Sequence, residues 1–517
     1  MMTDDFSYDR LPYPSKFFVQ TFPDRLATQA TLFGMDPPAV ETCRVLELGC
    51  GNGSNLIAQA YIMPKATFVG VDLGIGHIDD AKAAAAELGL TNVEFRQMDV
   101  MEMSEADFGK FDYITAHGLF SWIPDVVRER TLGLFAELLA SNGVGYLSYS
   151  AYPGAHEREI AQRAMRFASR NISEPTEKVA TALSFLKFAA ENTPNRGTFQ
   201  QTLANELKRH AVHAAADVFH DDLSDLNTPF YFHQFADMLG EHGLQFLAEA
   251  ELHAMGTNDL SAAARNFVDS LDDAVEREQY LDFLRGRAFR QTLFVHRSAD
   301  LERDLEPSIV DRFLIASSMR PAGAEPDLAS AKVERFVGPK GTGIELDLPL
   351  AKTAIAKLGT VWGRALPFGE LVEDSKRKLS EAGFAADDWE SQIEIVRKIV
   401  LQIALASNMI ELHVYQPTAE TAASSMPRIS RLARWQMKNA ANVLTQFGLD
   451  MKIEDRVSRH LLQLLDGTRS RNAVFDELGK FIRSAHDIEG KHEILRTLPE
   501  WLDASLGDLA RIGMFEA

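Results

Sequence analysis

The stretch Arg44-Val-Leu-Glu-Leu-Gly-Cys-Gly-Asn-Gly53 decides the fold of this chain. Its first five residues form a short segment typical of a buried strand, and Gly49, Gly51 and Gly53 follow at once. Glycine permits a tight turn from a strand into a helix and lets a ligand approach the backbone closely. Asp72 ends the next predicted strand, where a carboxylate can accept both ribose hydroxyls of a nucleoside. The pattern therefore predicts a nucleoside-binding turn.

Two classes of cofactor bind at such a turn, and the spacing of the glycines separates them. A dinucleotide fingerprint requires a glycine at position 54, where this chain has Ser54. Glu47, two residues before Gly49, suits a pyrophosphate badly because that group needs positive potential. It suits the sulfonium and the ammonium of S-adenosylmethionine well. We therefore expect S-adenosylmethionine here; the alternative is a glycine turn that serves only packing.

Strand-like and helix-like segments alternate after this turn. Strands are expected at 67–71, 93–97, 113–116 and 145–149, and helices at 54–63, 78–88 and 126–140. This alternation is typical of βαβ units and predicts an α/β fold with a doubly wound, Rossmann-like sheet. Two later apolar runs, at 243–250 and 292–296, are expected to complete the same sheet.

The domain organisation follows from these segments. The catalytic domain is expected over 44–156 and 228–300, behind an N-terminal arm at 1–43. A helical insertion, a linker and two mostly helical C-terminal modules account for the rest of the chain, at 157–227, 301–326, 327–420 and 421–517. Three helices and a short strand make the first module winged-helix-like, and a similar set in the second indicates an internal duplication.

The composition narrows the class of protein. The formal net charge is −21, and most of the acidic excess lies in residues 1–300, so general binding to nucleic acid is disfavoured. Only Cys43 and Cys50 are present, and neither a disulfide framework nor a metal site is expected. No apolar run is long enough to span a bilayer. We expect a cytoplasmic protein, and the sequence is compatible with a homodimer.

The segment from Val45 to Tyr149 resembles class I S-adenosylmethionine-dependent methyltransferases. The resemblance implies that the glycine loop lines the methionine part of the cofactor and that Asp72 holds the ribose. It also implies that Leu73 borders the adenine, that the Asp99 carboxylate accepts from the adenine amino group, and that Val100 offers its amide. The complete expected cofactor site is Glu47, Gly49, Cys50, Gly51, Asn52, Gly53, Asp72, Leu73, Asp99, Val100, His117 and Gly118.

A closer resemblance extends over nearly the whole chain. Five segments carry it: Tyr8–Ser15, Ala116–Pro124, Ser148–Gly154, Arg287–Leu293 and Leu465–Arg469. They resemble a subfamily with a methyltransferase regulatory domain, whose characterised members are bacterial protein-lysine methyltransferases that act on outer-membrane proteins. The resemblance implies a protein substrate and a lysine acceptor.

Lysine methylation needs a neutral amine, because the unperturbed pKa of lysine is about 10.4. An apolar aromatic channel favours the neutral amine by desolvation. Trp122 and Tyr149 follow predicted strands and Tyr13 lies in the arm, so we expect them to form this channel beside His117, a candidate base. The structural alternative is that these aromatic residues belong to the core.

Two other functions stay open at this point. The chain can be a small-molecule methyltransferase with regulatory C-terminal modules, or a binding protein without catalysis. A basic stripe formed by Arg428, Arg431, Arg434 and Lys438 raises the question of DNA binding. Because the chain is acidic, we expect this stripe to contact an acidic protein partner or to be a solvated face.

Overall fold

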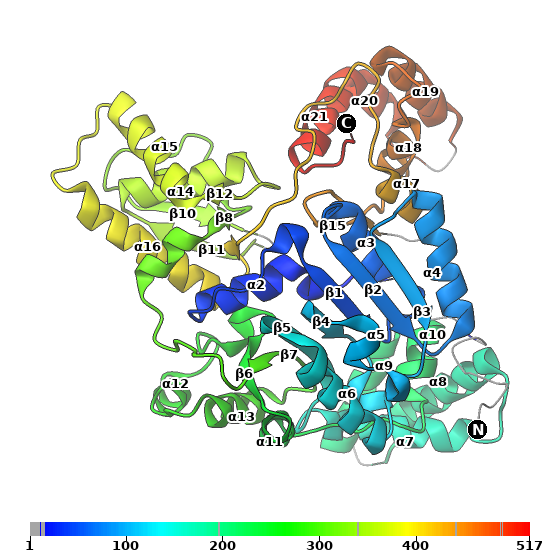
Figure 1. The fold of residues 1–517 in the computed structure, drawn as a ribbon. Coiled ribbons are helices and arrows are strands. Elements are labelled where there is room, and N and C mark those ends of the chain that lie inside the picture. The colour runs from blue at the N-terminus through cyan, green and yellow to red at the C-terminus, as the bar shows by residue number, and fades with distance from the viewer. Residues whose placement is uncertain are drawn as a thin grey trace.

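The structure, a computed structural model, describes residues 11, 16–194, 197–338, 341–439, 442–485, 488 and 490–516. A central sheet carries helices on both faces, and two helical modules project from it at the C-terminal end of the chain (Figure 1). The α/β fold with a doubly wound sheet is therefore confirmed.

The central sheet has seven strands in the order β3-β2-β1-β4-β5-β7-β6. The first five strands are parallel, and β7 runs antiparallel to both β5 and β6. The strands are β1 (Arg44–Leu48), β2 (Thr67–Asp72), β3 (Val93–Gln97), β4 (Phe111–Ala116), β5 (Leu139–Ser150), β6 (Leu244–Glu249) and β7 (Phe289–His296). The two late apolar runs of the sequence are β6 and β7, and both belong to this sheet.

Each face of the sheet has its own hydrophobic core. On one face Leu26, Ile57 and Ile78 are buried, from α2 (Pro23–Leu32), α3 (Ser54–Ile62) and α4 (Ile75–Leu88). On the other face Phe135 and Phe235 are buried, from α6 (Asp125–Leu138) and α11 (Phe232–Glu241). Short helices complete this domain: η1 (Val19–Thr21), η2 (Val40–Thr42), η3 (Val100–Glu102), α5 (Glu105–Phe108) and η4 (Phe120–Trp122).

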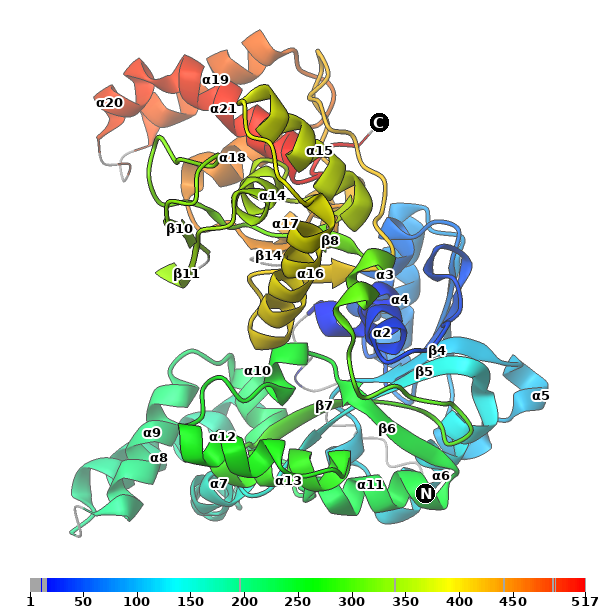
Figure 2. The ribbon, with the colours of Figure 1, turned by 90° about the vertical axis from the view of Figure 1, so that its left-hand side faces the viewer.

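The helical insertion follows β5 and precedes the last two strands. Its helices are α7 (Ala155–Ser169), α8 (Pro175–Asn192), α9 (Thr198–His210), α10 (Ala215–Asp217) and the π-helix η5 (Val218–Asp222). Met165, Leu186 and Leu203 form a small core between them. The chain then returns through α11, β6, η6 (Leu252–Met255), α12 (Ala262–Asp269) and α13 (Ala274–Arg285) to β7. Figure 2 shows α7, α8 and α9 beside α12 and α13, below the C-terminal modules.

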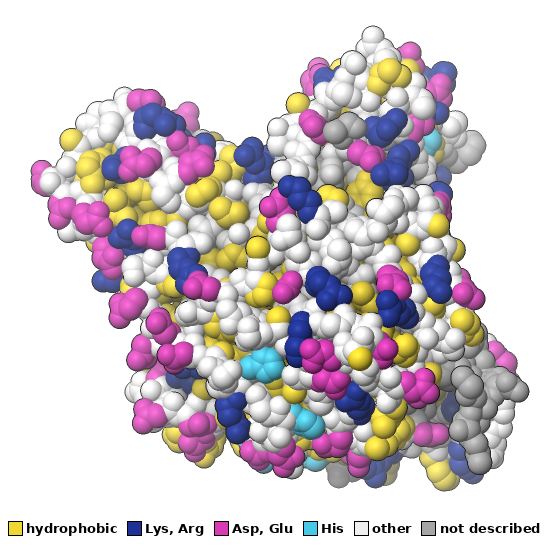
Figure 3. Space-filling view, in the orientation of Figure 1, with side chains coloured by type: hydrophobic (Ala, Val, Ile, Leu, Met, Phe, Trp, Pro, Cys, Tyr) yellow, Lys and Arg dark blue, Asp and Glu magenta, His cyan; other side chains and the backbone are white. Residues whose placement is uncertain are grey.

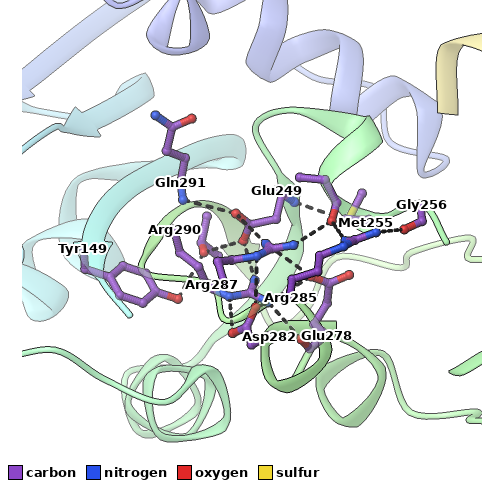
Figure 4. A network of polar contacts seen from close by, with 12 residues as sticks. Tyr149, Glu249, Met255, Gly256, Glu278, Asp282, Arg285, Arg287, Arg290 and Gln291 are labelled. Carbon is purple, nitrogen blue, oxygen red and sulfur yellow. Dashed lines mark hydrogen bonds and ion pairs between the residues drawn. The ribbon is translucent and has the colours of Figure 1, made fainter. Parts of the chain in front are cut away.

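A buried ionic network joins β6, β7 and α13 (Figure 4). Arg290 has a fully buried side chain and donates to Glu249 Oε1 at 2.6 Å, Glu278 Oε2 at 2.9 Å and Asp282 Oδ2 at 2.8 Å. Arg287 lies 3.0 Å from Asp282 on the same side. Buried charges are tolerated only when they are paired and hydrogen bonded, and here the pairing fixes the antiparallel edge of the sheet.

The first C-terminal module contains a three-stranded sheet in the order β12-β8-β13 and three helices. These elements are β8 (Leu314–Ala316), α14 (Pro349–Thr360), β12 (Leu366–Pro367), α15 (Phe368–Glu381), α16 (Trp389–Ala406) and β13 (Glu411–His413). A second small sheet joins β9 (Arg320–Pro321), β10 (Glu334–Val337) and β11 (Gly343–Leu346), and η7 (Pro307–Arg312) precedes both. The prediction of a linker at 301–326 is wrong, because β8 and β9 pair within this module.

The second C-terminal module has a core of its own, which includes Leu461, Leu478 and Leu502. Its elements are α17 (Arg431–Asn439), β14 (Asn442–Leu444), β15 (Asp450–Lys452), α18 (Arg456–Leu464), α19 (Arg471–Ser484), α20 (Lys491–Arg496) and α21 (Leu498–Arg511). The space-filling view shows an open notch between the two modules, and basic and acidic side chains are interspersed on this face (Figure 3). None of the helices in the described ranges combines the length and the apolar character needed to span a membrane.

Two residues of the basic stripe, Arg431 and Lys438, lie on α17 and form ion pairs with other parts of the chain. Lys438 Nζ lies 2.7 Å from Glu87 Oε1 on α4, and Arg431 Nε lies 3.2 Å from Glu516 Oε1. The Tyr61 hydroxyl, on α3, accepts from the Arg431 backbone N–H at 3.0 Å and donates to Glu516 at 3.1 Å. These contacts attach the second module to the helices of the catalytic domain and engage two of the four basic residues of the stripe.

Candidate active site

The glycine loop turns tightly around the carboxyl end of β2. Gly49, Gly51 and Gly53 have φ values of 71°, 54° and 71°, a region that side chains strain, and the backbone N–H of Gly49 donates to Val71 O at 2.8 Å. A Cβ atom at Gly53 would lie 2.6 Å from the ring of Phe95, whereas at Gly51 it would meet no atom within 4 Å. Gly53 is thus required by packing, and Gly51 leaves space for a ligand.

Asp72 orders the loop at the end of β2. One carboxylate oxygen accepts from the backbone N–H of Gly51 at 2.8 Å, and the other accepts from Gly74 N–H at 2.8 Å. Each carboxylate oxygen has two lone pairs, so both keep capacity for a ribose hydroxyl. The structure therefore shows a loop-ordering role for Asp72, and its contact with the ribose stays a prediction.

Glu47 is a buried acid, and only one of its carboxylate oxygens has a hydrogen-bond partner among the described residues. Its side chain accepts from Asn55 Nδ2 at 2.7 Å through Oε1, while buried Oε2 has no hydrogen-bond partner among the described residues. Burial raises the pKa of Glu47 to about 8, and the nearby Asp72 adds to this shift. A cation bound next to Oε2 would stabilise the ionised form. The donor set therefore fits the ammonium of S-adenosylmethionine, as the sequence predicts.

The structure shows local roles for Asn52 and Asp99, two residues of the expected cofactor site. Asn52 Oδ1 accepts from the Ser54 hydroxyl at 2.7 Å at the start of α3. Asp99 Oδ1 accepts from the Met101 backbone N–H at 2.9 Å and so caps the short helix η3, the helix that begins at Val100. Leu73 is exposed beside Asp72. The predicted adenine contacts of Leu73, Asp99 and Val100 stay predictions.

Two apolar residues at this rim were not predicted from the sequence. Ile75 and Met101 are both exposed, although most large apolar side chains of the catalytic domain are buried. Each lies just after the carboxyl end of a strand, Ile75 after β2 and Met101 after β3, as Leu73 does. Exposed apolar side chains at this edge suit the faces of an adenine ring. Their position after strand ends is the signal that could have identified them.

The N-terminal arm reaches the same site through Asn55. The Asn55 side chain accepts from the Phe18 backbone N–H at 3.1 Å and donates to Thr21 Oγ1 at 2.9 Å as well as to Glu47. The Phe18 ring stacks on the His117 ring with centroids 3.8 Å apart. The described part of the arm thus contacts both Asn55, which is hydrogen bonded to Glu47, and His117. Tyr13 lies outside the described residues.

His117 follows β4 and its ring is held on several sides. Nδ1 lies 2.7 Å from the Tyr146 hydroxyl, and the neighbouring Gly118, with φ of 68°, donates its N–H to Ser148 Oγ at 2.8 Å. Burial lowers the pKa of His117 to about 3, with a contribution from the Lys16 ammonium. The ring is therefore neutral at physiological pH, and it places no positive charge beside an incoming amine.

The predicted channel residues separate in the structure. Trp122 is half-buried and lines a cavity of about 440 Å³, which Phe289 and Arg158 also line. Tyr149 lies instead in the core: its ring stacks on Phe235 with centroids 4.2 Å apart, and it is fully buried. Its expected place on the channel is wrong because α11 covers this face of β5. Phe289 and Arg158 are lining residues that sequence reasoning missed.

Family models match three segments of the chain. A methyltransferase domain matches residues 39–181, a predicted methyltransferase regulatory domain matches 215–296, and a PKMT C-terminal winged helix domain matches 425–514. Together with the sheet order and the glycine-loop site, they define an S-adenosylmethionine-dependent methyltransferase. The chain belongs to the methyltransferase family that carries this regulatory domain and this winged helix.

Two relatives and a solved structure, all from Rickettsia, are similar to this chain. Uncharacterized protein RP789 of Rickettsia prowazekii (strain Madrid E) is 28% identical over 96% of this chain and 91% of that protein. Uncharacterized protein RP028 of the same strain is 34% identical over 46% of this chain and 94% of that protein. The structure of PKMT2 from Rickettsia typhi in complex with AdoHcy has a TM-score of 0.86 at 25% identity, over 98% of this chain and 100% of that chain.

The regulatory domain of the family model is not separate from the catalytic sheet. It spans 215–296, the segment that contains α11, β6 and β7. Since β7 pairs with β5 along six residue pairs, this segment completes the sheet that carries the glycine loop. A displacement of this segment would therefore shift the carboxyl ends of β4 and β5, where His117 and Ser150 lie.

Proposed function

We propose that the chain transfers the methyl group of S-adenosylmethionine to lysine side chains of a protein. The observation that carries this proposal is the likeness to PKMT2, a protein lysine methyltransferase, over nearly the whole of both chains. The winged helix domain, whose family model also carries the name PKMT, lies far from the glycine loop in the sequence. It adds surface for a large substrate. The resemblance of the sequence supports a target among outer-membrane proteins.

The residues at the glycine loop would hold the cofactor, with Glu47 Oε2 for its ammonium and Asp72 for its ribose. When bound, S-adenosylmethionine supplies an electrophilic methyl group on a sulfonium. The attacking amine must arrive neutral, so that its lone pair forms the new N–C bond as the C–S bond breaks. Alignment of the amine and exclusion of water are the main tasks left to the protein.

Three side chains beside the strand ends are suited to these tasks. Neutral His117, fixed between Phe18 and the Tyr146 hydroxyl, gives a flat wall without charge. Trp122 and Phe289 offer aromatic surface in the adjoining cavity. Desolvation there lowers the pKa of an entering lysine, and ring faces stabilise a partly methylated ammonium.

Transfer of labelled methyl groups tests the proposal. The purified chain is incubated with labelled S-adenosylmethionine and, in parallel, with cell-envelope protein fractions or a protein-free metabolite extract. We expect label in protein, stable to alkali as an N-methyl amine is. Efficient labelling of a metabolite without labelling of any protein fraction would make the chain a small-molecule methyltransferase instead.

A further inference from the structure

The cavity beside Trp122 is formed by two parts of the chain that are far apart in sequence. Ser150 at the end of β5 and Phe289 at the start of β7 form one wall, and α7 of the helical insertion forms another. The Phe289 ring lies 6.1 Å from the His117 ring. The cavity therefore adjoins the place where cofactor and acceptor are expected to meet.

Arg158, on α7, lines this cavity near the carboxylates of Glu206, Asp221 and Asp222. It is half-buried, and it makes no hydrogen bond or ion pair with any residue that the structure describes. Two other arginines of the cavity wall have carboxylate partners: Arg209 lies 2.7 Å from Asp222, and Arg163 lies 3.3 Å from Glu159. Burial and the neighbouring Arg209 lower the pKa of Arg158 in spite of these carboxylates. An anion that forms direct hydrogen bonds with the guanidinium would offset the cost of its burial.

The same cavity presents further unpaired polar atoms. Among the described residues, Trp122 Nε1 is a buried donor without a hydrogen-bond partner and Asn227 Oδ1 is a buried acceptor without one. A small free anion would use only the donors. A peptide with an acidic side chain uses both kinds of atom, because its N–H groups can donate to the acceptor.

We propose that this cavity binds an Asp or Glu side chain of the protein substrate close in sequence to the acceptor lysine, and that Arg158 selects it. Arginine binds a carboxylate through two parallel N–H donors, which gives geometric specificity as well as charge. The selection rests on the proposed function, since it assumes a protein-lysine acceptor. It makes Arg158 a specificity-determining residue and leaves cofactor binding to the glycine loop.

Mapping of methylated sites tests this selection. Cell-envelope proteins are methylated by the wild-type chain and by Arg158→Leu, Arg158→Lys and Arg170→Leu, and the modified lysines are located by mass spectrometry. Arg170 is the control: it lies at the end of the same helix, is exposed and does not line the cavity. Binding of S-adenosylhomocysteine and the thermal unfolding midpoint establish that each variant is folded.

We expect the wild-type sites to be enriched in Asp or Glu within a few residues of the lysine. Arg158→Leu should lose the enrichment, Arg158→Lys should keep part of it, and Arg170→Leu should keep all of it. For a peptide pair built on a strong site, with Glu or with Gln, the ratio of kcat/KM should fall from about tenfold to within about twofold in Arg158→Leu, chiefly through KM.

Two results would overturn the selection: wild-type sites without acidic enrichment, or an enrichment that survives in Arg158→Leu. A failure of the proposed function looks different, because no lysine would then be modified by the wild-type chain or by any variant. The experiment thus separates an error about Arg158 from an error about the acceptor.

Discussion

Glu47 is a buried carboxylate next to an open glycine turn, and its environment works against ionisation. Burial raises its pKa to about 8, so the group binds more protons in the folded chain than in the unfolded one. Its contribution to stability is therefore present at acidic pH and is lost as the pH rises from the usual carboxyl range through about 8. A bound ammonium reverses this tendency because it favours the carboxylate.

The affinity for S-adenosylhomocysteine should consequently depend on pH through Glu47. We expect binding to strengthen as the pH rises to about 8 and to release protons near neutrality. Glu47→Gln should remove this dependence and weaken binding at pH 8 by about 2 kcal/mol, the range for a hydrogen bond to a charged group. Calorimetry in buffers with different ionisation heats measures both effects. Equal pH profiles for the two proteins would show that Glu47 does not bind the ammonium.

Trp122 separates cofactor binding from acceptor binding. Its side chain lines the cavity beside His117 and makes no contact with the glycine loop that the structure records. Trp122→Ala should lower the rate of protein methylation at least tenfold, because the acceptor loses its aromatic wall, while the affinity for S-adenosylhomocysteine stays within a few fold. Initial rates and calorimetry on the same preparation test this. A parallel loss of both would assign Trp122 a structural role.

Single residues show where sequence reasoning works and where it ends. The glycine loop, Glu47 and Asp72 are adjacent in sequence or at strand ends, so their spacing alone predicted their meeting. Tyr149 was misplaced because the helix that buries it, α11, begins some 80 residues later. Arg158 was missed for a similar reason: nothing local shows that α7 folds back against the end of β7.

The antiparallel edge of the sheet depends on Arg290. Burial alone would lower its pKa, but Glu249, Glu278 and Asp282 raise it well above the usual value, so the guanidinium is charged. Arg290→Met would leave these buried carboxylates with too little positive charge. We expect the free energy of unfolding to fall by about 3–5 kcal/mol at neutral pH. Arg297→Met is the matched control, since Arg297 is exposed and its side chain donates to the Gly240 carbonyl.

The loss of unfolding free energy in Arg290→Met should become smaller at acidic pH. Burial raises the pKa of Glu278 and Asp282 even with Arg290 present, and removal of the arginine raises both further. Protonation then relieves the unpaired charges, so the deficit of Arg290→Met should shrink as the pH falls toward about 5. Urea denaturation at both pH values measures it. A deficit of equal size would mean that lost packing, not unpaired charge, causes the destabilisation.

Among the elements, strands with a regular apolar pattern were predicted well, including β6 and β7 beyond the insertion. The predicted linker failed because β8 has three residues and β9 has two, too few for periodicity to be recognised. Both are strands only because partners from later in the chain pair with them. Pairing of this kind is a tertiary effect that local sequence does not encode.

The arrangement of the whole molecule depends in part on weak contacts between modules. Lys438 and Glu87 join the second C-terminal module to α4, and their side chains are 65% and 53% exposed. Such exposed pairs contribute less than about 1 kcal/mol each. Lys438→Glu should therefore raise the rate of proteolysis between the modules modestly and leave cofactor affinity unchanged. Glu87→Lys in the same chain should restore the original rate; no restoration would deny the pairing.

The proposed function requires that this chain methylates lysine with a cofactor held at the glycine loop. Amino-acid analysis of protein hydrolysates, after reaction with labelled S-adenosylmethionine, tests it most directly, with Glu47→Gln as the matched variant. We expect label in methylated lysine for the wild-type chain, and at least a tenfold lower yield for Glu47→Gln at limiting cofactor. Label in any other amino acid, or equal yields from the two proteins, would contradict it.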